Sequence, residues 1–158
     1  MDFTFPLQTP MKIEEEIKQF KFKSTHQKAI INLLFTASWI QTEQQQFFKS
    51  YGITYQQFNI LRILKGQYPQ AISATEIKSR MLDKNSDVSR LLDRLTSKNL
   101  ILKQTCPKDK RAADVSITQA GLDILAELDK KQKKIDTVLS LTEKEAEDLS
   151  NLLDKGRG

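Results

Sequence analysis

Cysteine and histidine are nearly absent from this sequence of 158 residues, which holds one of each. A single cysteine cannot form an internal disulfide. Structural zinc sites are built mainly from cysteine and histidine, so we expect no metal site. The sequence also lacks a glycine-rich phosphate loop and a nucleophile elbow, and no catalytic motif surrounds the one histidine. We therefore expect a protein without cofactors that is not an enzyme.

Long apolar runs are missing as well. The longest, Ala29–Ile40, is interrupted by polar residues and is too short to cross a bilayer. The N-terminus lacks the basic flank and the apolar run of a secretory signal, so we expect a cytoplasmic protein with no membrane partner. With 39% hydrophobic and 28% charged residues, the composition is typical of one globular domain with helical extensions.

Positive charge is concentrated in one part of the chain. The net charge of +5 alone says little about partners. Between Lys84 and Asp114, however, lie eight basic residues (84, 90, 94, 98, 103, 108, 110 and 111) and four acidic ones (87, 93, 109 and 114), a difference of +4. The placement of the charge is therefore more informative than its total.

The N-terminal part of the chain predicts a long helix behind an irregular arm. Residues 1–23 form the arm, which would contain a short helix because Ile13, Ile17 and Phe20 have helical spacing. Residues 24–50 keep an amphipathic pattern until Gly52 ends it.

Several later helices begin at residues that can cap them. Thr54 with Gln57 and Ser73 with Glu76 have the spacing of a capping box, in which each side chain bonds the other residue's backbone N–H. A last helix begins in the same way, at Thr142 with Glu145.

Between these helices, one segment has two distinct faces. Its apolar side chains recur at helical spacing: Val88, Leu91, Leu92 and Leu95. The other face is polar and partly basic: Ser86, Asp87, Ser89, Arg90, Asp93, Arg94 and Ser97.

A hairpin follows. Asn99 suits the left-handed position after a helix, and the runs "LILKQT" and "AADVSIT" predict two strands joined by "CPKDKR". The order helix, short helix, two-faced helix and hairpin predicts a winged helix-turn-helix domain over residues 53–118. The fold is then mainly α with a small β-hairpin wing, and residues 119–155 form further C-terminal helices.

Three stretches closely resemble the MarR (multiple antibiotic resistance regulator) family of bacterial transcription factors: "YGITYQQFNIL", "VSRLLDRLTSKNLI" and "PKDKRAADVSITQAG". The resemblance covers about Ile30 to Leu153. The family's wing has an Asp-x-Arg core and a strand that leads into Thr-x-x-Gly, which here are Asp109, Arg111, Thr118 and Gly121. Cys106 departs from the acidic or polar residue that is more frequent there. The resemblance implies that residues 24–50 and 119–155 interlock two chains in a homodimer. The alternative is a monomer whose extra helices pack on its own domain.

The two-faced helix is suited to read DNA. A helix fits the major groove, and its first exposed side chains reach base edges, so the candidate readers are Ser86, Asp87, Ser89 and Arg90. Arg90 is the strongest candidate because arginine can donate two hydrogen bonds to guanine. Arg94, one turn later, would contact phosphate. The alternative is a face that is merely solvated.

The wing would contact the adjacent backbone or minor groove through Lys108, Lys110 and Arg111. Asp109 repels phosphate, and the resemblance implies that it holds Arg111 or the wing in place by an ion pair. The alternative is a charged, solvated hairpin.

A homodimer of this kind demands a pseudo-palindromic operator in double-stranded DNA. We expect a repressor, since repression needs only occupancy of a promoter. The alternatives are a protein-interaction module with the same fold and a nucleic-acid-binding protein without sequence preference. The resemblance also implies a small aromatic or anionic effector, with His26 and Trp39 as candidate ligand contacts. Alternatively, Trp39 is core or interface and His26 is solvated.

Cys106 lies among lysines that would lower the pKa of its thiol and favour oxidation. The simpler interpretation is that this cysteine has no role.

Overall fold

The computed structural model describes residues 12–106, 109–131 and 136–158, and for residues 105, 106 and 109–112 it describes the backbone alone. The chain divides into two units, residues 1–42 and 43–158. Within the described residues, no helix is both long and apolar enough to cross a membrane.

The first unit contains α1 (Ile13–Glu16) and most of α2 (Thr25–Lys49). Lys28 on α2 forms an ion pair with Glu14 on α1 and donates a hydrogen bond to its carboxylate. This hydrogen bond holds the pKa of the Glu14 carboxyl below its usual range. The helix expected near Ile13, Ile17 and Phe20 is only one turn long, because the backbone turns at Lys18, whose φ is +54°.

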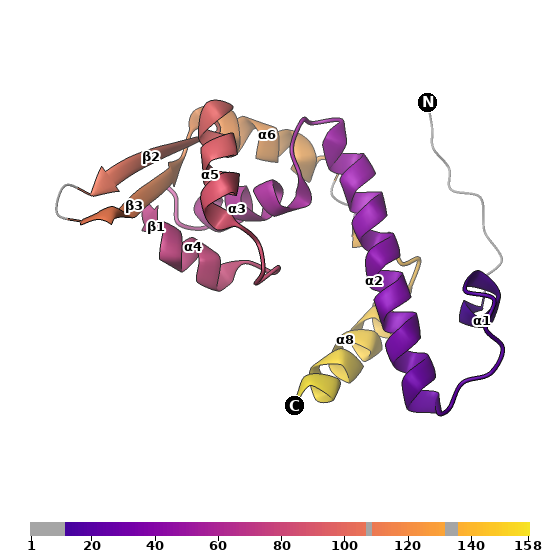
Figure 1. Ribbon diagram of the computed structural model, residues 1–158. Helices are drawn as coiled ribbons and strands as arrows, with labels where there is room; N and C mark the ends of the chain where they lie inside the picture. Colours follow the sequence, from indigo (N-terminus) through magenta and orange to yellow (C-terminus); the bar gives the residue numbers. More distant parts are fainter. Residues whose placement is uncertain (1–11, 107–108, 132–135) are drawn as a thin grey trace. The chain divides into compact units, whose positions relative to one another are not determined.

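The second unit holds the helices and strands expected of a winged helix-turn-helix fold (Figure 1). Its elements in chain order are α3 (Tyr55–Lys65), β1 (Ile72–Ser73), α4 (Ala74–Arg80), α5 (Val88–Ser97), β2 (Ile101–Cys106), β3 (Asp109–Ile117), α6 (Gln119–Asp129) and α8 (Glu143–Arg157). The prediction of a mainly helical fold with a small β wing is confirmed.

The sheet has three antiparallel strands in the order β1-β3-β2, one more than the sequence predicts. Strand β1 pairs Ile72 with Val115 of β3, while β2 pairs Ile101 with Ile117. With two residues, β1 is too short to show an alternating pattern, and so no pattern in the sequence predicts it.

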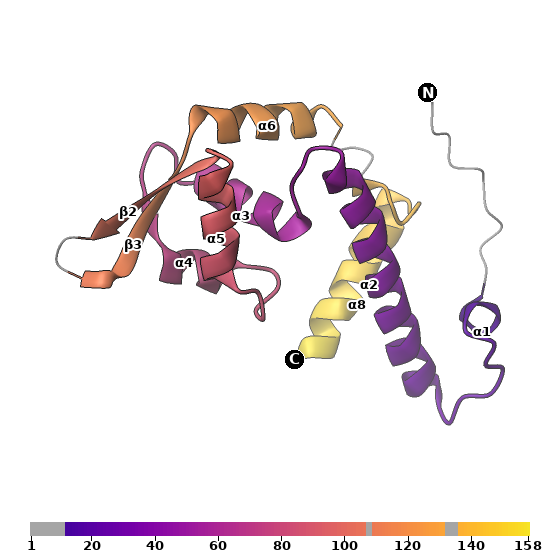
Figure 2. The same ribbon diagram turned by 45° about the horizontal axis from the view of Figure 1, so that its top comes forward.

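Helices α3, α4, α5 and α6 and the sheet share one hydrophobic core. Its least exposed side chains include Phe48, Ile60, Leu61, Leu64, Ile77, Leu92, Leu95, Ile101, Val115 and Leu125. Helix α6 lies across α3 (Figure 2), where Arg62 and Lys65 both bind Asp129, at 2.9 Å and 2.8 Å. The core thus fixes α5 and the wing strands on one scaffold.

Two of the three predicted capping boxes form. Thr54 with Gln57 opens α3, and Thr142 with Glu145 opens α8, where the hydrogen bonds from Thr142 lower the pKa of the Glu145 carboxyl.

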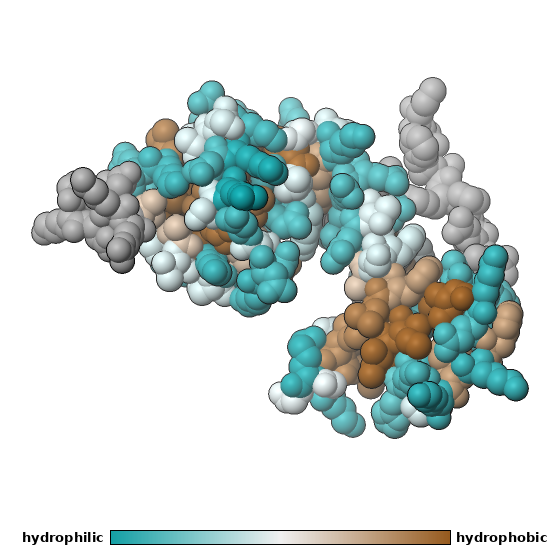
Figure 3. All heavy atoms as spheres, viewed as in Figure 1, coloured by the Kyte–Doolittle hydropathy of each residue, from teal (hydrophilic) through white to brown (hydrophobic). Residues whose placement is uncertain are grey.

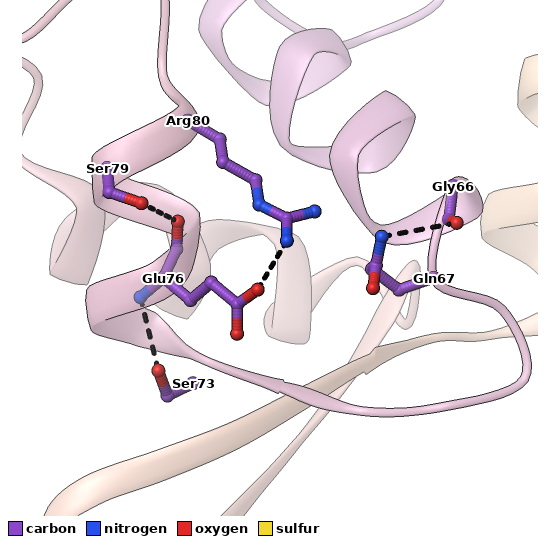
Figure 4. Close-up of polar contacts among 6 residues, drawn as sticks. All are labelled: Gly66, Gln67, Ser73, Glu76, Ser79 and Arg80. Atoms are coloured by element: carbon purple, nitrogen blue, oxygen red, sulfur yellow. Dashed lines mark hydrogen bonds and ion pairs between the residues drawn. The ribbon is translucent and has the colours of Figure 1, made fainter.

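At α4 the reciprocal half of the box is missing. Ser73 Oγ accepts from the Glu76 backbone N–H at 3.1 Å, but the Glu76 carboxylate turns to Arg80 (Figure 4). A guanidinium one turn away offers a charged donor, which a carboxylate bonds more strongly than a neutral backbone N–H. In the same view, Ser79 donates to the Glu76 carbonyl and Gln67 to that of Gly66.

Backbone conformations at two helix ends agree with the sequence. Gly52 follows α2 with φ +66°, and Asn99 follows α5 with φ +57°, the left-handed region that glycine and asparagine tolerate best.

Candidate nucleic-acid interface

Helix α5 carries the central part of the candidate site. It begins at Val88, and Asp87 is its N-cap, with Oδ1 accepting a hydrogen bond from the Arg90 backbone N–H at 3.2 Å. Ser86 and Asp87 therefore precede the helix, which corrects their expected place on its exposed face. Ser86 lies in the turn and donates from Oγ to Asp83 Oδ2 at 3.0 Å. The Asp83 carboxylate holds this turn, because it also accepts from the Asn85 backbone N–H at 3.0 Å.

From Val88 onward the two faces of α5 are as the sequence predicts, except that Leu91 is only partly buried. Val88, Leu92 and Leu95 are buried in the core, whereas Ser89, Arg90, Asp93 and Arg94 are exposed. Hydrophilic side chains cover α5 in the space-filling view (Figure 3). The core thus presents the polar face of α5 to solvent from a rigid base.

An open hollow of about 340 Å³ lies beside the N-terminal end of α5. It is lined by Thr54, Gln56, Asp83, Ser86, Asp87, Arg90, Leu91 and Arg94. Three predicted readers and the predicted phosphate contact, Arg94, therefore share one concave surface with Thr54, the N-cap of α3, and Gln56. Ser89, the fourth reader, lies on the exposed side of α5 without lining this hollow.

Ion pairs decide which cations of this region remain available. Arg90 Nε lies 3.2 Å from Asp87 Oδ2, and both side chains are exposed. Lys103 of β2 binds Asp93 of α5 at 2.9 Å, so part of its charge is balanced within the protein. Among the described residues, no acidic group pairs with Arg94.

The pair of Lys103 and Asp93 joins the wing strand to α5, and sequence reasoning missed it. The two residues lie on different elements ten positions apart, so no periodic pattern connects them. The surplus of basic residues between 84 and 114 was the only signal in the sequence.

The tip of the wing is described only in part. Lys108 lies outside the described residues. Asp109, Lys110 and Arg111 belong to β3 by their backbone, and their side chains lie outside the description, as does that of Cys106. The roles of these residues stay predictions.

The two candidate ligand contacts, His26 and Trp39, both lie on α2 and are exposed. Thirteen positions along one helix separate them by about 20 Å, so a single chain does not bring them together. No cluster of metal-binding side chains is present in the described parts of the chain.

Known proteins share this sequence and this fold. The family model that matches is that of the MarR family, over residues 53–113. The HTH-type transcriptional regulator MgrA of Staphylococcus aureus is 30% identical over 108 residues, which cover 68% of this chain and 72% of MgrA. The HTH-type transcriptional repressor MdtR of Bacillus subtilis is 37% identical over 82 residues, or 52% of each chain.

Among solved structures, a mutant of E. coli MarR complexed with operator DNA has a TM-score of 0.65 and 25% identity, over 84% of this chain and 98% of that chain. The relatives are transcriptional regulators, which confirms that this is not an enzyme. The identity to MgrA extends over more than two thirds of both chains, and the family model covers α5 and its support, so this chain belongs to the MarR family.

Proposed function

We propose that the protein is a homodimeric, sequence-specific DNA-binding transcriptional regulator that acts as a repressor. The observation that carries this proposal is the exposed polar face of α5, with Arg90 and Arg94 on one concave surface, in a fold shared with a MarR that is complexed with operator DNA. An exposed helix face that carries guanidinium groups fits the major groove.

The side chains of the site divide into readers and backbone contacts. Ser89 and Arg90 reach base edges, and Arg94, one turn further along α5, binds phosphate. The wing residues Lys108, Lys110 and Arg111 follow the neighbouring backbone or minor groove. Phosphate contacts position the protein, while the base contacts supply specificity.

Dimerisation rests on apolar surface that each unit leaves uncovered. In the first unit, α2 exposes Ile30, Leu33 and Leu34, which are 59%, 48% and 65% exposed, and this half of α2 is largely brown in Figure 3. In the second unit, α8 buries none of its residues and leaves Leu152 67% exposed. Large apolar side chains that lie exposed together on a helix are typical of protein interfaces. A second copy of the chain is the partner we assign to this apolar surface.

A homodimer presents two α5 helices related by a two-fold axis, and its operator is therefore pseudo-palindromic. MdtR, which shares 37% identity over 82 residues, is named a repressor. Repression requires only that the bound dimer occupy the promoter.

We further propose that a small aromatic or anionic ligand releases the DNA, with Trp39 or His26 at its site in the dimer. Salicylate-like compounds should quench the fluorescence of Trp39, which is the single tryptophan, and lower operator affinity. Operator affinity that stays constant across a broad panel of such compounds at saturating concentration would argue against this release.

Selection of genomic fragments by the purified protein, followed by sequencing, tests the proposed function. A regulator should enrich a few promoter fragments that share a pseudo-palindromic site. Uniform recovery of all fragments would indicate a binder without sequence preference, and no recovery would indicate a protein-interaction module.

A further inference from the structure

We propose that Asp87 is a positioning residue that holds the Arg90 guanidinium for recognition of guanine, rather than a reader of bases itself. This inference rests on the proposed function, because it assigns a task within the same interface.

Asp87 binds Arg90 at two points. Its Oδ1 accepts from the Arg90 backbone N–H at 3.2 Å, and its Oδ2 lies 3.2 Å from Arg90 Nε. One carboxylate thus spans the backbone and the side chain of the same arginine. Both of its oxygen atoms thus have a partner on Arg90, and a base would compete with the guanidinium for Oδ2.

The charge of this cap requires an explanation. Four other helices are capped by neutral hydroxyls, from Thr54, Ser73, Thr118 and Thr142. Serine and asparagine cap a helix about as well as aspartate does. A carboxylate at the start of α5 repels the phosphates that this helix would approach. Capping alone therefore does not require the charge of Asp87.

The ion pair also adds little to folding stability. The Arg90 and Asp87 side chains are 81% and 59% exposed, and water screens a pair that is so exposed. The ion pair instead restricts the conformation of the Arg90 side chain. A free arginine side chain must give up rotamer freedom on binding, and a side chain held beforehand gives up less.

Contact through Nε also selects how Arg90 can bind. Guanine presents the two acceptors O6 and N7 in the major groove, and two guanidinium nitrogens can bond them together. With Nε beside Asp87 Oδ2 in this ion pair, the terminal nitrogens Nη1 and Nη2 form the pair that lies outside the closest contact. The structure therefore predicts end-on recognition of guanine by Arg90.

Asp87→Asn separates positioning from capping. Asparagine keeps one acceptor oxygen for the Arg90 backbone N–H but replaces the other with a neutral amide NH₂, which cannot form an ion pair with the guanidinium. Dissociation constants are measured by fluorescence anisotropy for an operator selected by the wild-type protein and for a scrambled duplex of the same length. Asp93→Asn is the matched control, because it removes one negative charge from α5 at a residue whose ion-pair partner is Lys103.

The expected result is a loss of operator preference rather than an equal change in affinity for both duplexes. Removing a charge near phosphate should strengthen binding of Asp87→Asn to scrambled DNA, whereas the operator preference should fall by about fivefold. The control should bind both duplexes more tightly and keep its preference. The double variant Arg90→Ala/Asp87→Asn should have the same operator preference as Arg90→Ala alone. Asp87→Asn, Arg90→Ala and the double variant should all lose discrimination at the same guanine position. Asp87→Ser, which also caps, should behave as Asp87→Asn does.

Three results would overturn the inference. Asp87→Asn could keep the full operator preference, which would make Asp87 a cap alone. It could instead change the preferred base at a position that Arg90→Ala leaves intact, which would make Asp87 a reader. If the wild-type protein itself binds the operator no better than the scrambled duplex, the proposed function fails and the inference falls with it.

Discussion

The surroundings of Gly121 show why the family's Thr-x-x-Gly signature ends in glycine: there is no room for a Cβ atom at this position. Thr118 caps α6 by accepting from the Gly121 backbone N–H at 3.1 Å, and its hydroxyl donates to the Asn99 carbonyl at 2.8 Å. These bonds draw the start of α6 against the end of α5. A Cβ on Gly121 would lie 2.3 Å from the Leu100 carbonyl oxygen and 2.7 Å from Ile117 Cγ1. No side chain larger than hydrogen fits there.

Gly121→Ala should lower the free energy of unfolding by about 1 to 3 kcal/mol, because the backbone at Leu100 would have to move. Chemical denaturation monitored by circular dichroism measures the change. Gly156→Ala is the matched control, since nothing lies within 4 Å of its Cβ position and α8 continues through it. Alanine there should stabilise by up to about 1 kcal/mol. Equal effects of the two substitutions would contradict the close contact at Gly121.

Capping illustrates what the sequence can and cannot predict about single residues. The pairs at Thr54 and Thr142 form as their spacing predicts. Glu76 has the same spacing from Ser73 but binds Arg80, a competitor on its own helix. Spacing identifies candidate partners, whereas the choice among them depends on the side chains that the fold brings close.

At the scale of elements, the longer helices were predictable because they carry several turns of apolar periodicity, and α4 was predictable from its capping residues. Strand β1 was not, since two residues show no period. The polar face of α5 was also predictable. The pattern alone starts the helix too early, because Asp87 has the polar spacing although it is the N-cap and precedes the first helical residue. The bond between Lys103 and Asp93 depends on the packing of β2 against α5, and no local pattern reports that packing.

The wing permits a test of paired residues. We expect Arg111→Ala to weaken binding to operator and random DNA alike and to lower the logarithmic salt slope by about one for each phosphate that Arg111 neutralises. Asp109→Ala should also weaken binding, because the loss of order at Arg111 outweighs the relief of repulsion. The double variant should bind no more weakly than Arg111→Ala alone.

Titrations of DNA at several salt concentrations measure both quantities for each variant. Tighter binding by Asp109→Ala, together with an unchanged salt slope for Arg111→Ala, would show that the wing is an ordinary charged loop.

Helix α8 permits a test of assembly. Deleting the chain from Thr142 onward removes Leu149, Leu152 and Leu153, and this should weaken the dimer and hence operator binding. Leu152→Glu should do the same by placing a charge on an exposed apolar position. Ser150→Glu is its matched control, because it adds the same charge on α8 about 200° away around the helix axis. Analytical ultracentrifugation should find only the control unchanged. If all three variants remain dimeric, α8 lies outside the interface.

At the scale of the whole molecule, the charge distribution agrees with the placement of the site. The segment from Lys84 to Asp114 carries +4 of the net +5, and it contains α5, most of both wing strands and the turn before α5. The remainder of the chain is nearly neutral and exposes apolar side chains on α2 and α8. One part of the chain is therefore suited to a polyanion, and the exposed apolar side chains of α2 and α8 are the surface that we propose a second copy covers.

The central claim is that this protein recognises a particular DNA sequence, and the ratio of two dissociation constants tests it most directly. The constants are those for the operator obtained by genomic selection and for a scrambled duplex of equal length and composition, both measured at about 0.15 M salt. A specific regulator should bind the operator at least about a thousandfold more tightly. Equal affinity for the two duplexes would contradict the claim and would leave α5 as a helix that binds DNA by charge alone.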